Sequence, residues 1–498
     1  MQKKITTLHD AFMAASSRIT PRKATLLSQT FAPVVLLLSF FIFSMAYFAQ
    51  GIFAWSAGLA YITYDTLLLF FVAWQTFSLL HHEPTTLPKT QADFKELRNT
   101  DDIYLLKPMQ LTIGVMIAAY NEAEVLERTI TALINQTKPV EQIYIVDDGS
   151  NDATAQKLVS HYGFQNPSDA VFAKPLVSTL NPNLFWLRVA HGGKAIALNK
   201  ALFTVNTDIV ITVDADTLLA ANAIAQMHQA FANEPNLVAA TGVLTPVCSH
   251  QITGQFLQWF QTYEYIRNFV SRFAWMKADS LLLISGAFAG FRRSALLTVG
   301  GFDPNCLVED YELIHRMRRY AIEHALYWQV RVIGGAQART SAPSTFYGFL
   351  QQRRRWFAGF LQTQYWHRDM IVNRRFGKLG MWMLPVKTID TVQPFYGLIA
   401  FLFLIYYLAS NQLHLLSSVL LVIAFKILFD LCFHCWSIFL YKRWTNDQTD
   451  IRFSLAIIAA ILEPFTFQLL RHIGAVLGWY YFLTGRNSWG KQQRHQID

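Results

Sequence analysis

The hydrophobic positions of this 498-residue chain form long apolar runs towards both ends and a mixed region between them. Two runs come first, at about 31–50 and 53–80, and each reaches the roughly 20 residues that a bilayer-crossing helix needs. A very short link joins them, which predicts a transmembrane hairpin. Basic residues flank both ends of the hairpin, so we expect the N-terminal segment 1–30 and the segment after Leu80 to face the cytoplasm.

The region from about 110 to 339 predicts an α/β domain. Apolar, β-branched runs at 111–118, 142–146 and 208–213 are typical of buried strands. Helical patterns lie between them at 123–136 and 151–161. Because strands alternate with helices, we predict a parallel, doubly wound sheet that binds its ligand beyond the carboxyl ends of the strands.

The C-terminal third predicts an interfacial helix and further membrane spans. Segment 345–366 is rich in aromatic and basic residues, as a helix on a membrane surface should be. Apolar runs follow at 383–409, 415–441 and 453–483, which predicts three or four spans. The last run contains Glu463-Pro464 and exceeds the length of one span. It is either a single tilted span or a broken pair, and we favour the pair because it leaves the basic tail in the cytoplasm.

Composition supports a membrane protein with one folded domain. Apolar residues make up 53% and charged residues 15%, against about 25% charged in soluble domains. The net charge of +9 flanks apolar runs, which favours a membrane surface over nucleic acid. The four cysteines form no disulfide framework. The predicted order is an N-terminal segment 1–30, two transmembrane helices 31–80, the α/β domain 81–343, interfacial helices 344–380, C-terminal spans 381–485 and a basic tail 486–498.

Acidic residues at two places suggest group-transfer chemistry. Asp214 and Asp216 follow a predicted buried strand and supply oxygen ligands of the kind that Mg²⁺ and Mn²⁺ prefer. Such a pair is also common on solvated loops, and its place after a strand favours the metal site. Glu309 and Asp310 follow a turn signal and offer a general base for an attacking hydroxyl. An acidic pair that only stabilises a helix N-terminus explains them equally well.

Two basic motifs suggest contacts to phosphate and sugar. In Gln352–Trp356, Arg355 suits a pyrophosphate oxyanion and Trp356 offers a flat face to a sugar ring. The alternative is a membrane-surface helix with snorkelling arginines. His191-Gly192-Gly193-Lys194 precedes a predicted helix at 195–203, where a phosphate can approach closely. An ordinary loop with a solvated lysine is the alternative there. The spacing is not that of a Walker A loop, which disfavours a nucleoside triphosphatase.

Taken together and in this order, the motifs resemble those of the processive family 2 glycosyltransferases. That group includes poly-N-acetylglucosamine, chitin, hyaluronan and cellulose synthases. The resemblance covers about 110–366, and membrane topology extends it to most of the remaining chain. The matching pieces are Tyr120-Asn121-Glu122, Asp147-Asp148-Gly149-Ser150, Gly193-Lys194-Ala195 with Leu198-Asn199, Asp214-Ala215-Asp216, Glu309-Asp310, and Gln352 with Arg355 and Trp356.

The resemblance implies an α/β GT-A fold, a Rossmann-like nucleotide-sugar domain inserted between transmembrane helices, and an inverting mechanism. It assigns Asp310 as the base beside Glu309, and Asp214 and Asp216 to UDP and a Mg²⁺ or Mn²⁺ ion. Lys194 would touch the diphosphate. The remaining implied substrate contacts are Tyr120, Glu122 and Asp148 at uridine with help from Asp147, and Ser285, Gly286, Gln352, Arg355 and Trp356 at the acceptor end.

The resemblance also implies partners and a location. The expected partners are a UDP-sugar donor, a growing polysaccharide acceptor, the lipid bilayer and a small membrane accessory subunit, with no nucleic acid. The chain would be a multi-pass protein of the bacterial inner membrane with its catalytic domain in the cytoplasm. It would polymerise a UDP-sugar, with UDP-N-acetylglucosamine favoured, into a β-linked polysaccharide and secrete it through its own channel.

Some positions depart from the family pattern. Ala118-Ala119 replaces the usual proline before Tyr120, and Val308 replaces the common threonine before the acidic pair. Only a short tail follows the last run, so we expect no cyclic-dinucleotide-binding domain of the cellulose-synthase kind, which favours a poly-N-acetylglucosamine-type enzyme. The alternative function is transfer of one sugar to a membrane lipid. The third and least favoured is a non-catalytic membrane scaffold.

Overall fold

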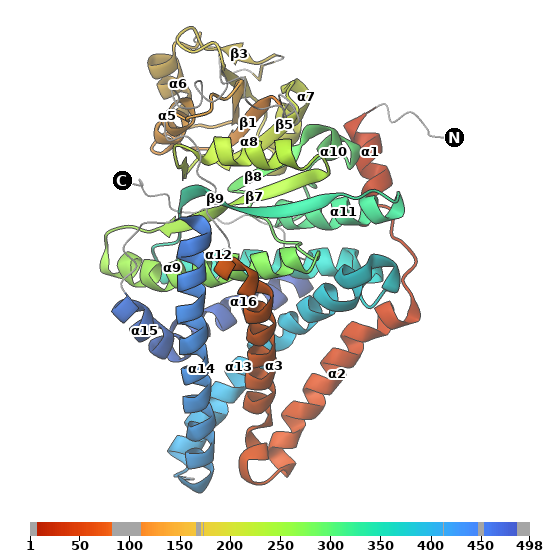
Figure 1. Ribbon diagram of the computed structural model, residues 1–498, viewed down its shortest axis with the longest axis vertical. Helices are drawn as coiled ribbons and strands as arrows, with labels where there is room; N and C mark the ends of the chain where they lie inside the picture. Colours follow the sequence, from red (N-terminus) through yellow and green to blue (C-terminus); the bar gives the residue numbers. More distant parts are fainter. Residues whose placement is uncertain are drawn as a thin grey trace.

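The computed structural model describes residues 7–81, 111–165, 171–172, 174–411, 413–446 and 453–485. The predicted basic tail and the basic segment that follows the hairpin lie outside the described residues, as does most of the loop 442–452. An α/β domain sits above a layer of helices that lie nearly flat, and long helices project below that layer (Figure 1). The segments far apart in sequence that flank the α/β domain therefore come together beneath it.

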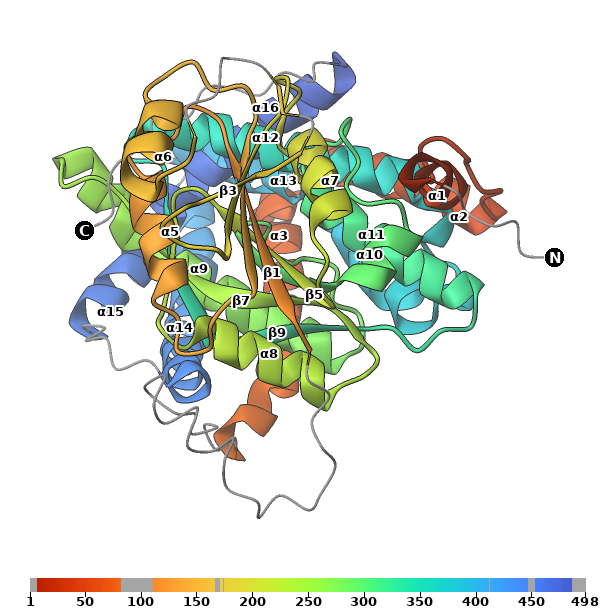
Figure 2. The same cartoon turned by 90° about the horizontal axis from the view of Figure 1, so that it is seen from above.

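Buried strands form the core of the α/β domain because their apolar runs leave few polar side chains to solvate. The four neighbouring parallel strands are β1 (Ile113–Ala119), β2 (Gln142–Asp147), β4 (Leu184–Arg188) and β5 (Ile209–Asp214). Helices α5 (Leu126–Ile134) and α6 (Thr154–Tyr162) lie on one side of these strands, and α7 (Lys194–Thr204) lies on the other (Figure 2). This half has the predicted doubly wound form.

The whole sheet is mixed, so the prediction of a parallel sheet was wrong for its second half. Its nine strands have the order β3-β4-β2-β1-β5-β8-β7-β9-β6. Strand β8 pairs antiparallel with both β5 and β7, while β7 and β9 are parallel. Apolar patterning reports burial and not strand direction, which is why the sequence did not reveal the reversal. The remaining strands are β3 (Leu176–Val177), β6 (Thr217–Leu219), β7 (Leu237–Val247), β8 (Phe288–Arg292) and β9 (Gln329–Ser341).

Helices of the second half frame the lower edge of the sheet. Helix α9 is 26 residues long and lies in the flat layer beneath the sheet (Figure 1). Helix α11 begins at Glu309, so the acidic pair forms its first turn. The elements of this half are α8 (Ala223–Asn233), α9 (Ile252–Lys277), α10 (Arg293–Thr298), α11 (Glu309–Glu323), α12 (Phe346–Trp366) and the short η3 (Arg368–Met370) and η4 (Arg374–Phe376).

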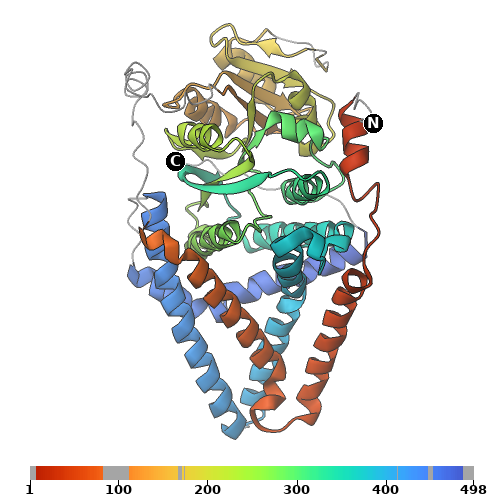
Figure 3. The same ribbon diagram turned by 45° about the vertical axis from the view of Figure 1, so that its right-hand side comes forward.

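Four helices in the described part of the chain are long and apolar enough to cross a membrane: Leu26–Ala46, Gly51–Leu80, Leu379–Ala409 and Leu416–Thr445. They project side by side from one face of the molecule (Figure 3). Many of their large apolar side chains are exposed, as those of a protein surrounded by lipid are. The chain is therefore a membrane protein. The elements are α2 (Leu26–Phe48), η1 (Gly51–Trp55), α3 (Ser56–Thr76), η2 (Phe77–His81), η5 (Leu379–Met383), α13 (Leu384–Ala409) and α14 (Leu413–Thr445).

The last apolar run is broken where Glu463-Pro464 lies within it. Helix α15 (Phe453–Leu462) and helix α16 (Phe467–Leu483) meet at the short η6 (Glu463–Phe465), and the pair is bent by 46°. Helix α16 packs closely on α12. A Cβ at Gly474 would lie 2.6 Å from the Cβ of Arg353, and one at Gly478 would lie 2.7 Å from the Cβ of Phe357. The two glycines, one turn apart, allow this close approach.

The N-terminal helix α1 (Leu8–Ala15) docks on the α/β domain next to the turn that leads to the acidic pair. Arg18 makes a two-pronged ion pair with Asp303, at 2.8 and 3.0 Å, and the Asp303 side chain is fully buried. Phe12 packs over Gly300, whose φ is +85°. A Cβ at Gly300 would collide with the Phe12 backbone. Glycine is therefore required there for two separate reasons.

Replacing Gly300 with alanine is expected to loosen α1 and lower thermal stability. The left-handed backbone alone costs alanine about 1–2 kcal/mol, and the collision with Phe12 adds to that cost. Gly377→Ala is the matched control, because Gly377 has a φ of +55° and open space around its Cβ. The measurement is the midpoint of heat-induced unfolding in detergent. Equal midpoints for the two variants would contradict the proposed contact with α1.

Candidate active site

The loops after β1 and β2 are bound to each other at the carboxyl edge of the sheet. Asn121 takes a left-handed conformation, with φ of 56°. Its backbone N–H donates to the Ser150 hydroxyl at 3.0 Å, and its side-chain oxygen accepts from the Asn151 N–H at 2.9 Å. Tyr120 and the buried Glu122 therefore stand on a loop whose position is set by the neighbouring strand.

Asp148 anchors the glycine loop that precedes α7. Its two carboxylate oxygens accept from the backbone N–H groups of Gly192 and Gly193, each at 2.9 Å. The His191 ring lies 3.0 Å from the same carboxylate and stacks on Tyr120, with 4.2 Å between ring centroids. The sequence singled out Asp148 and Tyr120 separately. The structure joins them through His191, a residue to which no role was assigned.

Asp147 has a different position from Asp148. It is fully buried, accepts from the Ser150 N–H at 2.7 Å and lies 3.5 Å from Arg188. Burial raises the pKa of its carboxyl group, and the Ser150 bonds and Arg188 oppose that rise. Asp147 does not line the cavity described below. Its contacts hold the Asp147–Ser150 turn together, and any effect on a ligand is exerted through that turn.

Lys194 stands between carboxylates from two parts of the domain. Its ammonium lies 2.5 Å from Asp214 at the end of β5 and 3.5 Å from Glu309 at the start of α11. Burial alone would lower the pKa of Lys194, but the two carboxylates raise it above its ordinary value. Burial raises the pKa of Glu309, against the opposing effect of Lys194. Lys194 therefore stays charged at neutral pH, as a cation between the end of β5 and the start of α11.

Asp310 is held by the loop that contains Ser285 and Gly286. Its Oδ2 accepts from the Gly286 N–H at 2.7 Å, and its Oδ1 accepts from the N–H of Tyr311 at 2.8 Å. A Cβ at Gly286 would lie 3.0 Å from the same Oδ2, which is tighter than ordinary packing. The carboxylate is thus oriented by backbone groups, with its remaining lone pairs available to a proton on a substrate.

Asp214 and Asp216 line the same cavity on either side of the turn between β5 and β6. Among the described residues, no group of three or more His, Cys, Asp or Glu side chains has the arrangement of a metal site. A Mg²⁺ or Mn²⁺ ion that bridges a diphosphate needs only one or two protein carboxylates, because phosphate and water supply the other ligands. The two aspartates fit that kind of site and not an all-protein metal cage.

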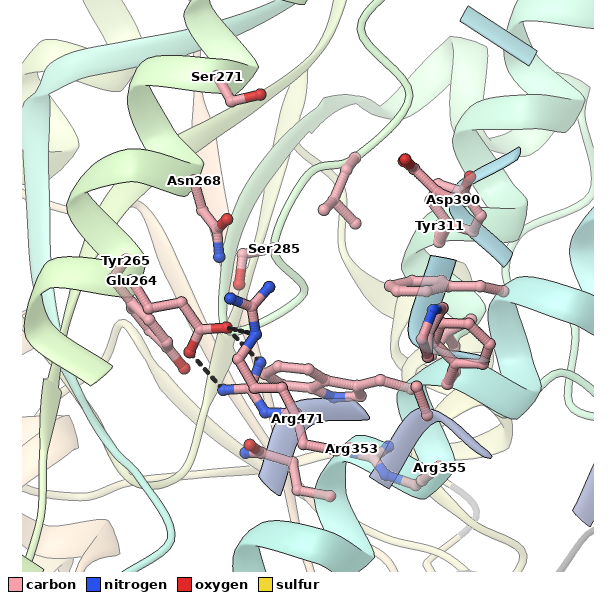
Figure 4. Close-up of a pocket in the computed structure, with 18 of the residues that line it drawn as sticks. Glu264, Tyr265, Asn268, Ser271, Ser285, Tyr311, Arg353, Arg355, Asp390 and Arg471 are labelled. Atoms are coloured by element: carbon pink, nitrogen blue, oxygen red, sulfur yellow. Dashed lines mark hydrogen bonds and ion pairs between the residues drawn. The ribbon is translucent and has the colours of Figure 1, made fainter. Parts of the chain in front are cut away.

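The three consecutive arginines of α12 go to three different places. Arg353 makes a two-pronged ion pair with Glu264 of α9, 2.7 Å for each bond (Figure 4). Arg354 lies over the Tyr481 ring of α16, 4.3 Å from its centroid. Arg355 donates to the carbonyl of Leu307 at 3.4 Å. The three arginines therefore have different surroundings, and Arg355 lies close to the acidic pair through its contact with Leu307.

One cavity of about 1510 Å³ connects these groups. It runs from the strand ends, past Asp310 and Trp356, into the space between the membrane helices. Apart from Asp147, every predicted site residue lines it. These lining residues are Tyr120, Glu122, Asp148, Lys194, Asp214, Asp216, Ser285, Gly286, Glu309, Asp310, Gln352, Arg355 and Trp356.

The membrane end of the cavity contains charged residues that no sequence motif singled out. Lys426 of α14 lies 2.8 Å from Asp65 of α3 and also contacts Asp430. All three line the cavity. Charged side chains within membrane spans are energetically costly and usually face a polar interior. The charged residues inside the predicted spans were therefore the sequence signal that could have predicted this part of the cavity.

Comparison with known proteins agrees with this geometry. Residues 114–300 match the profile of glycosyl transferase family 2, and residues 209–441 match that of glycosyl transferase family group 2. The chain belongs to the family 2 glycosyltransferases. The second match extends through helix α12 and into α14, so the family likeness of this glycosyltransferase includes apolar helices outside the α/β domain.

Curated relatives resemble the glycosyltransferase over about half of its length. It is 28% identical over 292 residues to a poly-beta-1,6-N-acetyl-D-glucosamine synthase of Staphylococcus epidermidis, a match that covers 58% of this chain and 64% of the relative. It is 29% identical over 254 residues to the enzyme of the same name from Staphylococcus aureus strain COL, covering 50% and 54%.

A solved structure of low sequence identity has the same fold. The mannosyltransferase PcManGT from Pyrobaculum calidifontis, in complex with GDP-Man and Mn²⁺, superposes with a TM-score of 0.51 at 18% identity. The match covers 83% of this chain and 99% of that one. The α/β domain therefore has the GT-A fold that the sequence predicted.

Proposed function

We propose that this glycosyltransferase polymerises a UDP-sugar, with UDP-N-acetylglucosamine favoured, into a β-linked polysaccharide. The observation that carries the proposal is the single cavity that leads from the strand-end carboxylates into the membrane helices. A transferase that releases a small soluble product has no need of such a passage. The names of the staphylococcal relatives support the N-acetylated sugar and a polymeric product.

The donor would bind where the loops after β1, β2 and β4 meet. Tyr120, Glu122 and Asp148 surround the place for uridine, and Asp147 keeps the Asp148 turn in position. Lys194 would neutralise charge on the diphosphate as the bond to the sugar breaks, since an ammonium freed from Asp214 has donors to offer. Arg355 adds a second cation at the acceptor side of the same groups.

Asp214 and Asp216 would hold a Mg²⁺ or Mn²⁺ ion. When bound, that ion acts as a Lewis acid that stabilises the diphosphate leaving group. The two aspartates supply hard oxygen ligands at a strand end, and Lys194, which pairs with Asp214 in this structure, would turn to the diphosphate when the ion takes Asp214. Mn²⁺ in the complex of the Pyrobaculum mannosyltransferase supports a divalent ion in this fold.

Asp310 would take the proton from the attacking hydroxyl. Its carboxylate is oriented by the N–H groups of Gly286 and Tyr311. Glu309 faces Lys194 and helps to keep that lysine charged. One direct displacement from the side opposite the diphosphate inverts the sugar, which gives a β-linkage from an α-linked donor. Trp356 and Gln352 would hold the acceptor end, with Ser285 and Gly286 beside the base.

The growing polymer would leave through the membrane helices. In this proposal the catalytic domain faces the cytoplasm of a bacterial inner membrane, as the basic flanks of the spans favour. The polymer would move along the cavity past Lys426 and its two aspartates. A small membrane accessory subunit would assemble with the exposed apolar faces of the spans.

The test is incubation of the purified enzyme in liposomes with radiolabelled UDP-N-acetylglucosamine and either Mg²⁺ or Mn²⁺. We expect a ladder of long products that a hydrolase specific for β-linked N-acetylglucosamine degrades, with part of the label protected inside sealed vesicles. A single glycolipid as the only product would replace polymerisation with transfer of one sugar to a lipid. No release of UDP from any common UDP-sugar would favour a non-catalytic scaffold.

Asp310→Asn is expected to lower the turnover number by about 10²- to 10⁴-fold, because the amide cannot accept the proton. Affinity for UDP, measured by calorimetry, should stay within about twofold of the unaltered enzyme. Glu323→Gln is the control, since Glu323 lies at the far end of the same helix and pairs with Arg22. Loss of UDP affinity in Asp310→Asn would show that Asp310 is not the base.

Asp216→Ala is expected to remove the increase in UDP affinity that Mn²⁺ produces. The binding of UDP would be titrated with and without Mn²⁺ in both proteins, with EDTA present in the metal-free series. Asp208→Ala is the control, because Asp208 lies before the start of β5, where its carboxylate bonds Thr112 and does not line the cavity. An equal effect of Mn²⁺ on UDP affinity in Asp216→Ala would reject this metal ligand.

A further inference from the structure

Helix α9 presents one of its faces to the cavity between the acidic pair and the membrane helices. Tyr265, Asn268, Arg272 and Trp275 lie three or four residues apart, which places them on one side of the helix. All four line the cavity, as does the neighbouring Ser271. Figure 4 shows Asn268 and Ser285 facing the same part of the cavity. No role for this helix follows from the motifs of the chain.

Arg272 differs from Arg267 and Arg353, which lie in the same layer of helices. Its Nε and Nη1 atoms are buried and have no hydrogen-bond partner, and no ion pair joins it to another side chain in the described part of the chain. The ring of Phe269 lies against it, 4.5 Å from the guanidinium carbon to the centroid. Arg267 on the same helix pairs with Glu463, and Arg353 pairs with Glu264.

Buried N–H groups without a partner make this guanidinium costly unless a ligand at its remaining nitrogen offsets that cost. Leaving a buried donor unsatisfied costs free energy, and more so when the donor is charged. Burial lowers the pKa of Arg272 to about 10, while the charge of Asp310 opposes that fall. The group is therefore still a cation at neutral pH. The third nitrogen, Nη2, is not closed off in this way, and its two N–H groups are free to face a ligand oxygen in the cavity.

The neighbouring charge narrows the class of ligand. The negative charge of Asp310 acts on Arg272, so the positive charge of the guanidinium is already partly balanced. A neutral oxygen acceptor fits this balance better than a second anion. The position of α9 favours the acceptor over the donor, because its Trp275 packs on Phe71 of α3 at 4.6 Å between centroids, on the membrane side of the domain.

We propose that Arg272 donates hydrogen bonds to the acetamido carbonyl of the terminal sugar of the acceptor, and so selects an N-acetylated chain end. Asn268 and Ser271 on the same helix face complete this subsite. The inference rests on the proposed function, because it assigns the acceptor of that reaction. It makes Arg272 a specificity-determining residue of the acceptor, separate from the donor groups at the strand ends.

The test pairs a change in the protein with a change in the substrate. Two oligosaccharide acceptors are compared, one ending in N-acetylglucosamine and one of the same length ending in glucose, with UDP-N-acetylglucosamine as donor. A hydrogen bond to a charged group is worth about 10- to 100-fold in binding. The unaltered enzyme should prefer the N-acetylated acceptor by that ratio in kcat/KM, and Arg272→Met should bring the ratio to within about threefold of one.

Two further variants separate the role of Arg272 from a general loss of structure. Arg272→Lys keeps the charge and one donor, so its preference should be intermediate. Arg331→Met makes the same chemical change at a residue that pairs with Glu234 outside the cavity, and it should keep the full preference. UDP affinity and the KM for the donor should stay unchanged in every variant, which also reports that each protein is folded.

The possible outcomes separate a failure of the Arg272 assignment from a failure of the proposed function. If Arg272→Met keeps the full preference for the N-acetylated acceptor, or raises the KM for the donor, the inference is wrong and the proposed function stands. If the unaltered enzyme transfers sugar to neither acceptor, the proposed function fails and the inference fails with it. Collapse of the preference with intact UDP binding supports the assignment.

Discussion

The carboxylate of Glu264 joins three helices at the junction between the α/β domain and the membrane. It accepts two bonds from Arg353 of α12, at 2.7 Å each, and lies 3.1 Å from the Nε of Arg471 of α16. A buried charge is tolerated only when partners replace the water it has lost, and two guanidinium groups do so here. Because α12 also carries Gln352, Arg355 and Trp356, this ion cluster sets how those side chains face the strand-end carboxylates.

The flat layer of helices lines one cavity that is common to the α/β domain and the membrane helices. Helix α9 contacts the cavity with one face and packs on α3 and α14 with others, so the strand-end carboxylates and the space between the membrane helices open into the same cavity. In the proposed reaction, the sugar added last already occupies the entrance of the passage. Each addition then needs only a short movement of the chain before the next donor binds.

Local patterns predicted the strands and the chemistry at their ends, because both depend on residues close together in sequence. The side chains of adjacent residues nevertheless make different contacts. Asp148 holds the glycine loop, whereas Asp147, the last residue of β2, points into the turn and away from the cavity. Side chains alternate between faces along a strand, and only the coordinates tell which member of the pair faces the ligand. The reversed direction of β8 was hidden for a similar reason, since apolar runs do not encode direction.

Long-range partners were beyond the reach of the sequence. Glu264 and Arg353 are 89 residues apart, and nothing in either neighbourhood marks one as the partner of the other. The same holds for Arg272, which stands out because partners are missing and not because of any motif. The run of three arginines illustrates this limit of sequence-based prediction. The three residues are identical in sequence, yet one makes an ion pair, one a ring contact and one a contact to a backbone carbonyl.

Gly474 and Gly478 place α16 directly on the backbone of α12, and hydropathy gives no sign of this because their contribution is an absent methyl group. The spacing of these two helices thus depends on two residues that have no side chain. A substitution at either glycine would push α16 away from α12, which carries Trp356, and so alter the wall of the cavity without changing any group proposed to touch sugar.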